Sequence, residues 1–109
     1  NQAASALTIA AALHPSAAVC GTPTHLAMDI ISELESLDRG RYAGPVGWVD
    51  TQGDGEWAIA LRGGQVRPGS PEEIQLFAGA GIVADSSPEA ELEETGAKFV
   101  PMLQALGLR

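Results

Sequence analysis

The sequence has little cysteine, few aromatic residues and little positive charge, and these shortages exclude several classes of protein. With one cysteine, Cys20, among 109 residues, an internal disulfide is impossible, which is typical of a reducing compartment. Six Lys and Arg residues stand against 14 acidic residues, so the formal net charge is -8 and no basic surface is available to neutralise nucleic-acid phosphates or anionic lipids. No apolar run is long enough to span a membrane. We therefore expect a cytoplasmic protein that binds neither nucleic acid nor membrane.

The chain does contain enough apolar sequence to build a packed core. Hydrophobic residues make up 45% of it, so its composition does not predict disorder. Its length suits one small domain or a piece of a larger one. It begins at Asn1, without Met, a basic start or a leader-like apolar segment. We expect a fragment whose N-terminal part is absent.

Capping residues and prolines predict three helices. The first covers residues 5–13, because a residue that precedes a proline, here Pro15, disfavours the helical conformation. Residues 17–23 are apolar and predict an extended piece. A second helix is expected over 22–37, where Thr-Pro supplies a cap and a first-turn proline. A third is expected over 87–106, with Ser-Pro at its start.

The middle of the chain predicts strands. Residues 42–50 and 55–62 are β-type runs around the glycine-rich turn TQGDG, which indicates a hairpin. A third strand is expected over 73–81, after a loop over 63–72. Consecutive strands with short connections favour an antiparallel sheet over parallel βαβ units. The predicted fold class is therefore α+β, an antiparallel three-stranded sheet segment with flanking helices, whose edges need cover from further chain.

The last predicted helix carries four glutamates. At about 100° per residue, Glu91, Glu94 and Lys98 fall on one line beside the apolar stripe. Glu89 and Glu93 face elsewhere and are expected to be charges of the first helical turn. Spacing alone leaves two interpretations of the line. It is either a weak surface ion pair from Glu94 to Lys98 or a pair of carboxylates that offers oxygens to a hard cation such as Mg²⁺.

Other candidate positions also have two interpretations. The GAG segment from Gly79 to Gly81 is typical of a strand end or bulge, or of backbone N–H groups that an anion approaches. Arg62 is either a charge at a hairpin edge or a fork for a carboxylate. Tyr42 is more typical of a half-buried sheet surface than of a ligand contact. Cys20 is more typical of a packed thiol than of a nucleophile.

Three motifs occur in a fixed order: ALHPSAAVCGTP at 12–23, DRGRYAGPVGWVDTQGDGEWAIALR at 38–62 and LFAGAGIVADSSPEAELEETGAK at 76–98. Together they resemble the C-terminal part of the chorismate-utilising enzymes, most closely the isochorismate synthases. The resemblance implies that residues 1–109 are a C-terminal fragment of a chorismate-binding catalytic domain, with the corresponding portion of the family's α/β fold. It also implies Mg²⁺-dependent isomerisation of chorismate to isochorismate, in which water adds at C2 and the C4 hydroxyl leaves.

The resemblance assigns expected roles to individual residues. Glu94 is similar to a direct Mg²⁺ ligand, and Glu91 to a neighbour that holds a metal-bound water. Seven positions are similar to substrate contacts: Ala18 and Val19 at the ring, Tyr42, Arg62, Gly79 and Gly81 at the pyruvyl carboxylate, and Lys98 near substrate and metal. The family's general base and general acid are expected before Asn1, so the chain itself is expected to hold no catalytic acid or base and to be inactive alone.

Charge agrees with this assignment. Chorismate is a dianion, and a chain of net charge -8 repels it unless cations gather at the site. Mg²⁺ at Glu94, with Lys98 and Arg62 nearby, supplies that positive charge.

Several alternatives stay open. A salicylate synthase, which also eliminates pyruvate, shares these motifs. Ala18 in place of threonine favours water over ammonia, and so disfavours an anthranilate or aminodeoxychorismate synthase component. In a non-catalytic interaction module, the acidic helix would instead be a binding surface. The pathway, siderophore or menaquinone biosynthesis, and the oligomeric state are not determined by the sequence.

Overall fold

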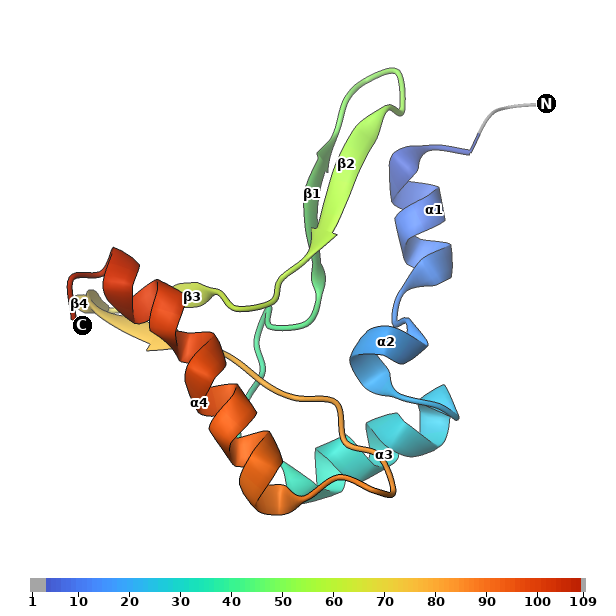
Figure 1. The fold of residues 1–109 in the computed structure, drawn as a ribbon. Coiled ribbons are helices and arrows are strands. Elements are labelled where there is room, and N and C mark those ends of the chain that lie inside the picture. Colours follow the sequence, from blue (N-terminus) through green and yellow to red (C-terminus); the bar gives the residue numbers. More distant parts are fainter. Residues whose placement is uncertain (1–3, 109) are drawn as a thin grey trace. The chain divides into compact units, whose positions relative to one another are not determined.

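The computed structural model describes residues 4–108, which divide after Ala60 into two compact units. Helices and antiparallel strand pairs make up both units, so the predicted α+β class is confirmed (Figure 1). The elements of unit 1 are α1 (Ala6–Leu13), α2 (Ala17–Cys20), α3 (Thr24–Leu34), β1 (Pro45–Val49) and β2 (Gly55–Ile59). The elements of unit 2 are β3 (Gly64–Arg67), β4 (Ser70–Leu76) and α4 (Pro88–Ala105).

The predicted hairpin of unit 1 is confirmed. Strands β1 and β2 pair antiparallel, with Val49 opposite Gly55 at the turn. The side chain of Asp50 closes this turn, because its Oδ1 accepts hydrogen bonds from the backbone N–H groups of Gln52 at 2.8 Å and Asp54 at 3.0 Å. Helix α1 contacts β2. An acidic side chain at the first position of the turn therefore stabilises the connection between the two strands.

The helices of unit 1 differ from the prediction in two places. Helix α1 ends before Pro15, as expected. The prediction of an extended piece over 17–23 is wrong, because residues 17–20 form the helical turn α2. Gly21 ends this turn, at a φ of 95° with its N–H bonded to the Ala17 carbonyl at 2.8 Å. Two adjacent alanines favour the helical turn, and the glycine supplies the positive φ that stops it.

Helix α3 is shorter than predicted, covering residues 24–34 where 22–37 was expected. Glu35 already has an extended backbone, with φ of -82° and ψ of 127°, although its N–H still bonds the Ile31 carbonyl. The carboxylate of Glu35 is held by Arg39, which lies outside the helix. The helix thus stops at the residue whose side chain bonds the following turn.

The predicted three-stranded sheet is wrong. The described residues form two separate two-stranded antiparallel sheets, β1–β2 and β3–β4. The expected loop over 63–72 contains β3, and Gly69 at a φ of 83° makes its tight turn into β4. The chain turns between β2 and β3 at Arg62, whose φ of 50° is in the left-handed region and interrupts extended structure. Strand β4 starts earlier than predicted and ends at Leu76, before GAG.

Helix α4 follows the prediction closely. Ser87 is its N-cap and accepts a hydrogen bond from the Ala90 N–H, while Pro88 occupies the first turn. The helix continues through Pro101. The structure describes no helix long and apolar enough to cross a membrane within residues 4–108.

The apolar residues of this chain are largely uncovered. Ala43, 8% exposed, is the one buried hydrophobic residue of the described chain, whereas Leu34 is 76% and Leu92 is 74% exposed. The accessible surface area of a folded protein follows from its mass. Two folded proteins, each with half of this chain's 11.2 kDa, would together expose an accessible surface of about 6,900 Å². The chain exposes 8435 Å². Its apolar faces are therefore those of elements that lack a covering layer.

Candidate functional site

Lys98 joins two of the predicted site segments of unit 2. From α4, its Nζ donates a hydrogen bond to the carbonyl oxygen of Gly79 at 2.9 Å and forms an ion pair with Glu94 Oε1 at 2.6 Å. The Lys98 side chain is 23% exposed and that of Glu94 is 54% exposed. One ammonium group therefore holds the GAG segment and the acidic face of α4 together.

The ion pair from Glu94 to Lys98, one of the two interpretations that helical spacing left open, is present in the structure. The bond from Lys98 to the Gly79 carbonyl was not predicted. Its partners are 19 residues apart, on a helix and an irregular segment, so no periodic pattern joins them.

The GAG segment is anchored on both sides. Before it, the Phe77 N–H donates to the Gly63 carbonyl at 2.9 Å, which extends the β3–β4 pairing by one step. After it, Val83 and Ser86 close a turn through two 3.0 Å bonds, one to the Ser86 Oγ and one to the Val83 carbonyl. The Lys98 bond holds its first residue, Gly79. A β-strand, a turn and a helix therefore all determine where the backbone of GAG lies.

The two predicted metal-binding glutamates lie on one side of α4. Glu91 is half-buried and Glu94 is exposed, three positions apart on the same helix. Among residues 4–108 there is no group of three or more His, Cys, Asp or Glu side chains that could hold a metal ion. Within residues 4–108, a cation at this face of α4 would therefore meet the carboxylates of Glu91 and Glu94, and Mg²⁺ commonly takes one or two carboxylates from protein when water and substrate supply the other oxygens.

The remaining glutamates of α4 are solvated. Glu89 is in the first turn, where its own backbone N–H and the Ser87 hydroxyl stabilise the carboxylate and lower its pKa. The expectation that Glu93 also belongs to the first turn is wrong, because the acidic residues of that turn are Glu89 and Glu91. Glu93 is exposed.

Arg62 and Gly81 both leave room around them. Arg62 is exposed and has no hydrogen bond or ion pair to the described part of the chain. A Cβ added to Gly81 would meet no atom within 4 Å, so the backbone there is open to approach. Both features suit residues that contact a bound anion.

Three predicted substrate contacts belong to unit 1. Ala18 is exposed and Val19 is half-buried, both on α2. Tyr42 is half-buried as expected, but it lies in the turn before β1 and not on a strand. Its N–H donates to the Arg39 carbonyl at 2.8 Å, and its ring centroid lies 5.5 Å from the Arg39 Cζ.

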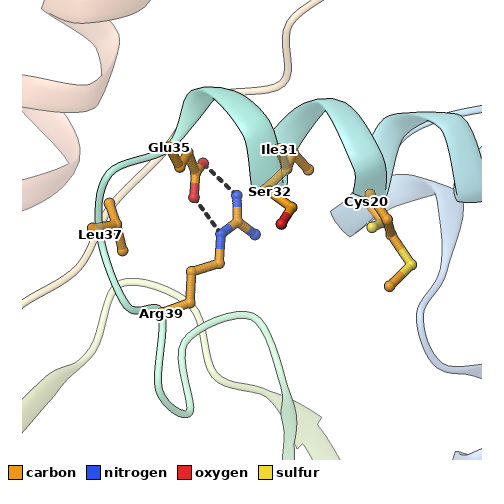
Figure 2. Close-up of a pocket in the computed structure, with 7 residues that line it drawn as sticks. Cys20, Ile31, Ser32, Glu35, Leu37 and Arg39 are labelled. Atoms are coloured by element: carbon orange, nitrogen blue, oxygen red, sulfur yellow. Dashed lines mark hydrogen bonds and ion pairs between the residues drawn. The ribbon is translucent and has the colours of Figure 1, made fainter.

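Unit 1 contains a groove of about 320 Å³ beside this turn, which Figure 2 shows. The residues that line it are Cys20, Met28, Ile31, Ser32, Glu35, Leu37 and Arg39. Arg39 crosses the groove wall with Nε 2.7 Å from Glu35 Oε2 and Nη2 2.6 Å from Glu35 Oε1. These two hydrogen bonds, donated by Arg39, lower the pKa of Glu35 and raise the pKa of Arg39.

Sequence reasoning missed Glu35 and Arg39. Their i, i+4 spacing was a usable signal, the same spacing that singled out Glu94 and Lys98. The predicted helix ended at residue 37, between Glu35 and Arg39, so helical spacing did not relate the two side chains.

A second groove of unit 1, about 340 Å³, lies between α1 and the hairpin. It is lined by Ala10, Leu13, His14, Ser16, Pro45, Trp57, Ala58 and Ile59. The Trp57 Nε1 is buried and has no hydrogen-bond partner in the described chain. A buried donor without an acceptor costs about 1–3 kcal/mol, so this indole lacks an acceptor that additional chain could provide.

The predicted site residues thus fall into two groups. Unit 2 holds the metal candidates and most substrate candidates, and it brings Gly79, Glu94 and Lys98 into direct contact. Unit 1 holds Tyr42 and the α2 pair.

Comparison with known proteins assigns the class. The chorismate binding enzyme family matches residues 1–107, and the chain belongs to this family. The isochorismate synthase DhbC of Bacillus subtilis (strain 168) is 53% identical over 103 residues, 94% of this chain. The vibriobactin-specific isochorismate synthase of Vibrio cholerae is 52% identical over 103 residues, again 94% of this chain.

The fold comparison agrees. The crystal structure of DhbC from Bacillus anthracis matches with a TM-score of 0.93 and 49% identity, covering 100% of this chain and 28% of that one. The chain spans 25% of the length of the two isochorismate synthases above. The resemblance to the isochorismate synthases is thereby confirmed, over about a quarter of their length.

Proposed function

We propose that this chain is the C-terminal segment of an isochorismate synthase, which converts chorismate to isochorismate with Mg²⁺. The observation that carries the proposal is the three-way contact of Lys98 with Glu94 and Gly79. Those three positions match the family's metal ligand, anion-binding loop and site lysine. An ion pair on a solvated helix face forms without a bond to a carbonyl 19 residues away. The additional bond from Lys98 to Gly79 is what we expect of a binding site that a helix and a loop form together.

The carboxylates fit the ion. Glu94 and Glu91 would hold Mg²⁺ from two successive positions of one helical side, with water between Glu91 and the ion. When bound, Mg²⁺ supplies positive charge to the ring carboxylate of chorismate and stabilises charge that develops as the hydroxyl group is exchanged. Lys98 already bonds Glu94, so the site carries a compensating cation before any metal arrives.

The other residues of the chain bind and orient the substrate in this proposal. The backbone at Gly81 is open to approach, and the N–H groups of the GAG segment donate hydrogen bonds to the pyruvyl carboxylate. Arg62 adds a guanidinium fork from a strained turn, and Tyr42 adds a hydroxyl. Ala18 and Val19 lie along the ring. The general base and general acid belong to polypeptide beyond this segment.

The uncovered surface supports a longer protein. A chain that exposes 8435 Å², with large apolar side chains such as Leu34 and Leu92 in water, gains stability from an additional layer. The buried indole N–H of Trp57 needs an acceptor that the described residues do not provide. We therefore propose that the isolated 109 residues do not turn over chorismate.

The test is product analysis with the full polypeptide that carries this segment. Incubation with chorismate and Mg²⁺ is expected to give isochorismate alone, and chelation of the metal is expected to stop the reaction. Pyruvate release would instead identify a salicylate synthase, and an amine product with ammonium would identify an anthranilate or aminodeoxychorismate synthase. Isochorismate formed by the isolated segment would contradict the proposed division of the site.

A further inference from the structure

We propose that Arg39 is a positioning residue, anchored by Glu35, that sets the orientation of the Tyr42 ring. The inference rests on the proposed function in one respect, that Tyr42 contacts the substrate. The positioning itself is read from contacts within unit 1: two hydrogen bonds, one ring contact and one turn.

Glu35 fixes the plane of the Arg39 guanidinium. The bonds from Nε at 2.7 Å and Nη2 at 2.6 Å form a two-point fork, so the guanidinium cannot rotate without breaking one of them (Figure 2). Glu35 is the C-cap of α3, and its backbone is still tied to the helix through the Ile31 carbonyl. The orientation of Arg39 is thereby referred to the end of a helix.

The backbone of Tyr42 is fixed independently of its ring. Its N–H bonds the Arg39 carbonyl, which closes a turn. The next residue, Ala43, is buried, has a φ of 64° and bonds the Ala60 carbonyl at 2.9 Å. The Cα of Tyr42 is therefore held by the hairpin, and the direction of its ring depends on the two side-chain torsions.

The Arg39 guanidinium lies against the Tyr42 ring and so restricts these torsions. Its Cζ lies 5.5 Å from the centroid of the Tyr42 ring, within the range in which a cation over an aromatic face is attracted. A half-exposed ion pair contributes little to stability, so the fork and the ring contact are better suited to orientation than to holding the fold. Lysine could not take this role, because an ammonium group has no planar fork.

The first arm of the test follows the ring directly. The full polypeptide is labelled with 3-fluorotyrosine, and Tyr42→Phe identifies the ¹⁹F resonance of Tyr42. Arg39→Gln is expected to shift and broaden that resonance. The matched control is Arg41→Gln, which removes one positive charge from the same turn at an exposed residue outside the Glu35–Arg39 fork. An Arg39→Gln resonance unchanged from the parent would overturn the proposal.

The second arm separates positioning from stability. Arg39→Gln is expected to raise KM for chorismate about 3- to 10-fold, the scale of a lost cation–ring contact, with kcat nearly unchanged. The exchange Glu35→Arg with Arg39→Glu rebuilds an ion pair but places no cation over the ring. Arg39→Gln is expected to lower the thermal midpoint slightly, and we expect the exchange to restore the midpoint and leave KM raised. Recovery of KM together with the midpoint would show a merely structural role and contradict the proposal.

The two arms also distinguish failure of the proposed function. If Tyr42→Phe leaves KM at the parent value while Arg39→Gln displaces the ¹⁹F resonance, the substrate contact of Tyr42 is wrong and the positioning by Arg39 stands. If the resonance is unmoved, the positioning is wrong whatever Tyr42 contacts.

Discussion

The two units each contain a Glu-to-basic pair at i, i+4, and the pairs differ in their third partner. In unit 1, Arg39 bonds Glu35 with two nitrogens and lies over the Tyr42 ring. In unit 2, Lys98 bonds Glu94 with its single nitrogen and donates to the Gly79 carbonyl as well. The Arg pair joins a helix end to a turn four residues away, and the Lys pair joins a helix to a segment 19 residues away.

The i, i+4 spacing of the two pairs does not distinguish their roles. On spacing alone, both pairs are weak surface contacts worth about 0.3–0.5 kcal/mol. The third partner separates them: a ring contact suits the first pair to the orienting role that we propose, and a loop carbonyl ties the second pair to the GAG segment, where we propose an anion and metal site.

The largest effect is expected from removal of the metal candidate of unit 2. In the full polypeptide, Glu94→Gln should lower metal-dependent chorismate turnover by at least about 100-fold, since it removes the charged ligand while keeping the shape of the side chain. Turnover is measured by isochorismate formation over a Mg²⁺ series. Glu93→Gln, on the adjacent and exposed position of α4, is the control and should retain parent activity.

Lys98 can be divided into its charge and its bond to the loop. Lys98→Met loses both, whereas Lys98→Gln keeps a donor for the Gly79 carbonyl and loses the charge. We expect both variants to raise KM for chorismate, Lys98→Met by about 30-fold and Lys98→Gln by about 10-fold, because charge near a dianion and order of the loop both contribute. Equal values for the two variants would show that the loop bond contributes nothing.

Two open glycines of unit 2 give a matched pair. A Cβ at Gly81 or at Gly96 meets no atom within 4 Å, so neither change to alanine disturbs the described structure. Gly81→Ala is expected to raise KM about 5- to 10-fold with no loss of thermal stability, because the added methyl group blocks close approach of an anion to the backbone. Gly96→Ala, inside α4, should stabilise the protein by about 0.5–1 kcal/mol and leave KM unchanged. If Gly81→Ala leaves KM unchanged, the GAG segment does not contact substrate.

The smallest effect concerns the pH dependence of the Arg pair. The pKa of Glu35 is lowered by its bonds from Arg39, so its contribution to stability is present above the unfolded-state pKa and is lost as pH falls through the lower folded-state value. Glu35→Gln should therefore lower the thermal midpoint near neutral pH by an amount equivalent to about 0.5 kcal/mol, given the exposure of the pair. As pH falls through the lowered folded-state pKa of Glu35, the two midpoints should converge. A difference that grows on acidification would contradict the sign.

Much of the fold follows from local signals that act over a few residues. Ser87 with Pro88, the proline after α1 and the glycine-rich turn after Asp50 each predicted an element that the structure contains. The errors arose where a neighbour decided the outcome. Residues 17–20 form a helical turn that ends at Gly21, and the third strand of the expected sheet belongs to a separate hairpin after Arg62, whose φ of 50° interrupts the extended backbone.

Several residues of the candidate site could be predicted from the sequence, but the contact that joins two of its segments could not. Helical spacing placed Glu91, Glu94 and Lys98 on one line, and resemblance added roles that spacing alone left open. Nothing local relates Lys98 to Gly79, because their contact depends on how the segment after β4 returns to α4. Arg39 was missed for the converse reason, since the expected helix extended over a bend that the side chain of Glu35 occupies.

The most direct test of the central claim is calorimetric titration of Mg²⁺ into the full polypeptide in the presence of chorismate. If Glu94 is a Mg²⁺ ligand, we expect saturable Mg²⁺ binding by the parent and by Glu93→Gln, and binding weakened by at least about 10-fold in Glu94→Gln. Equal Mg²⁺ affinity in Glu94→Gln and the parent would contradict it.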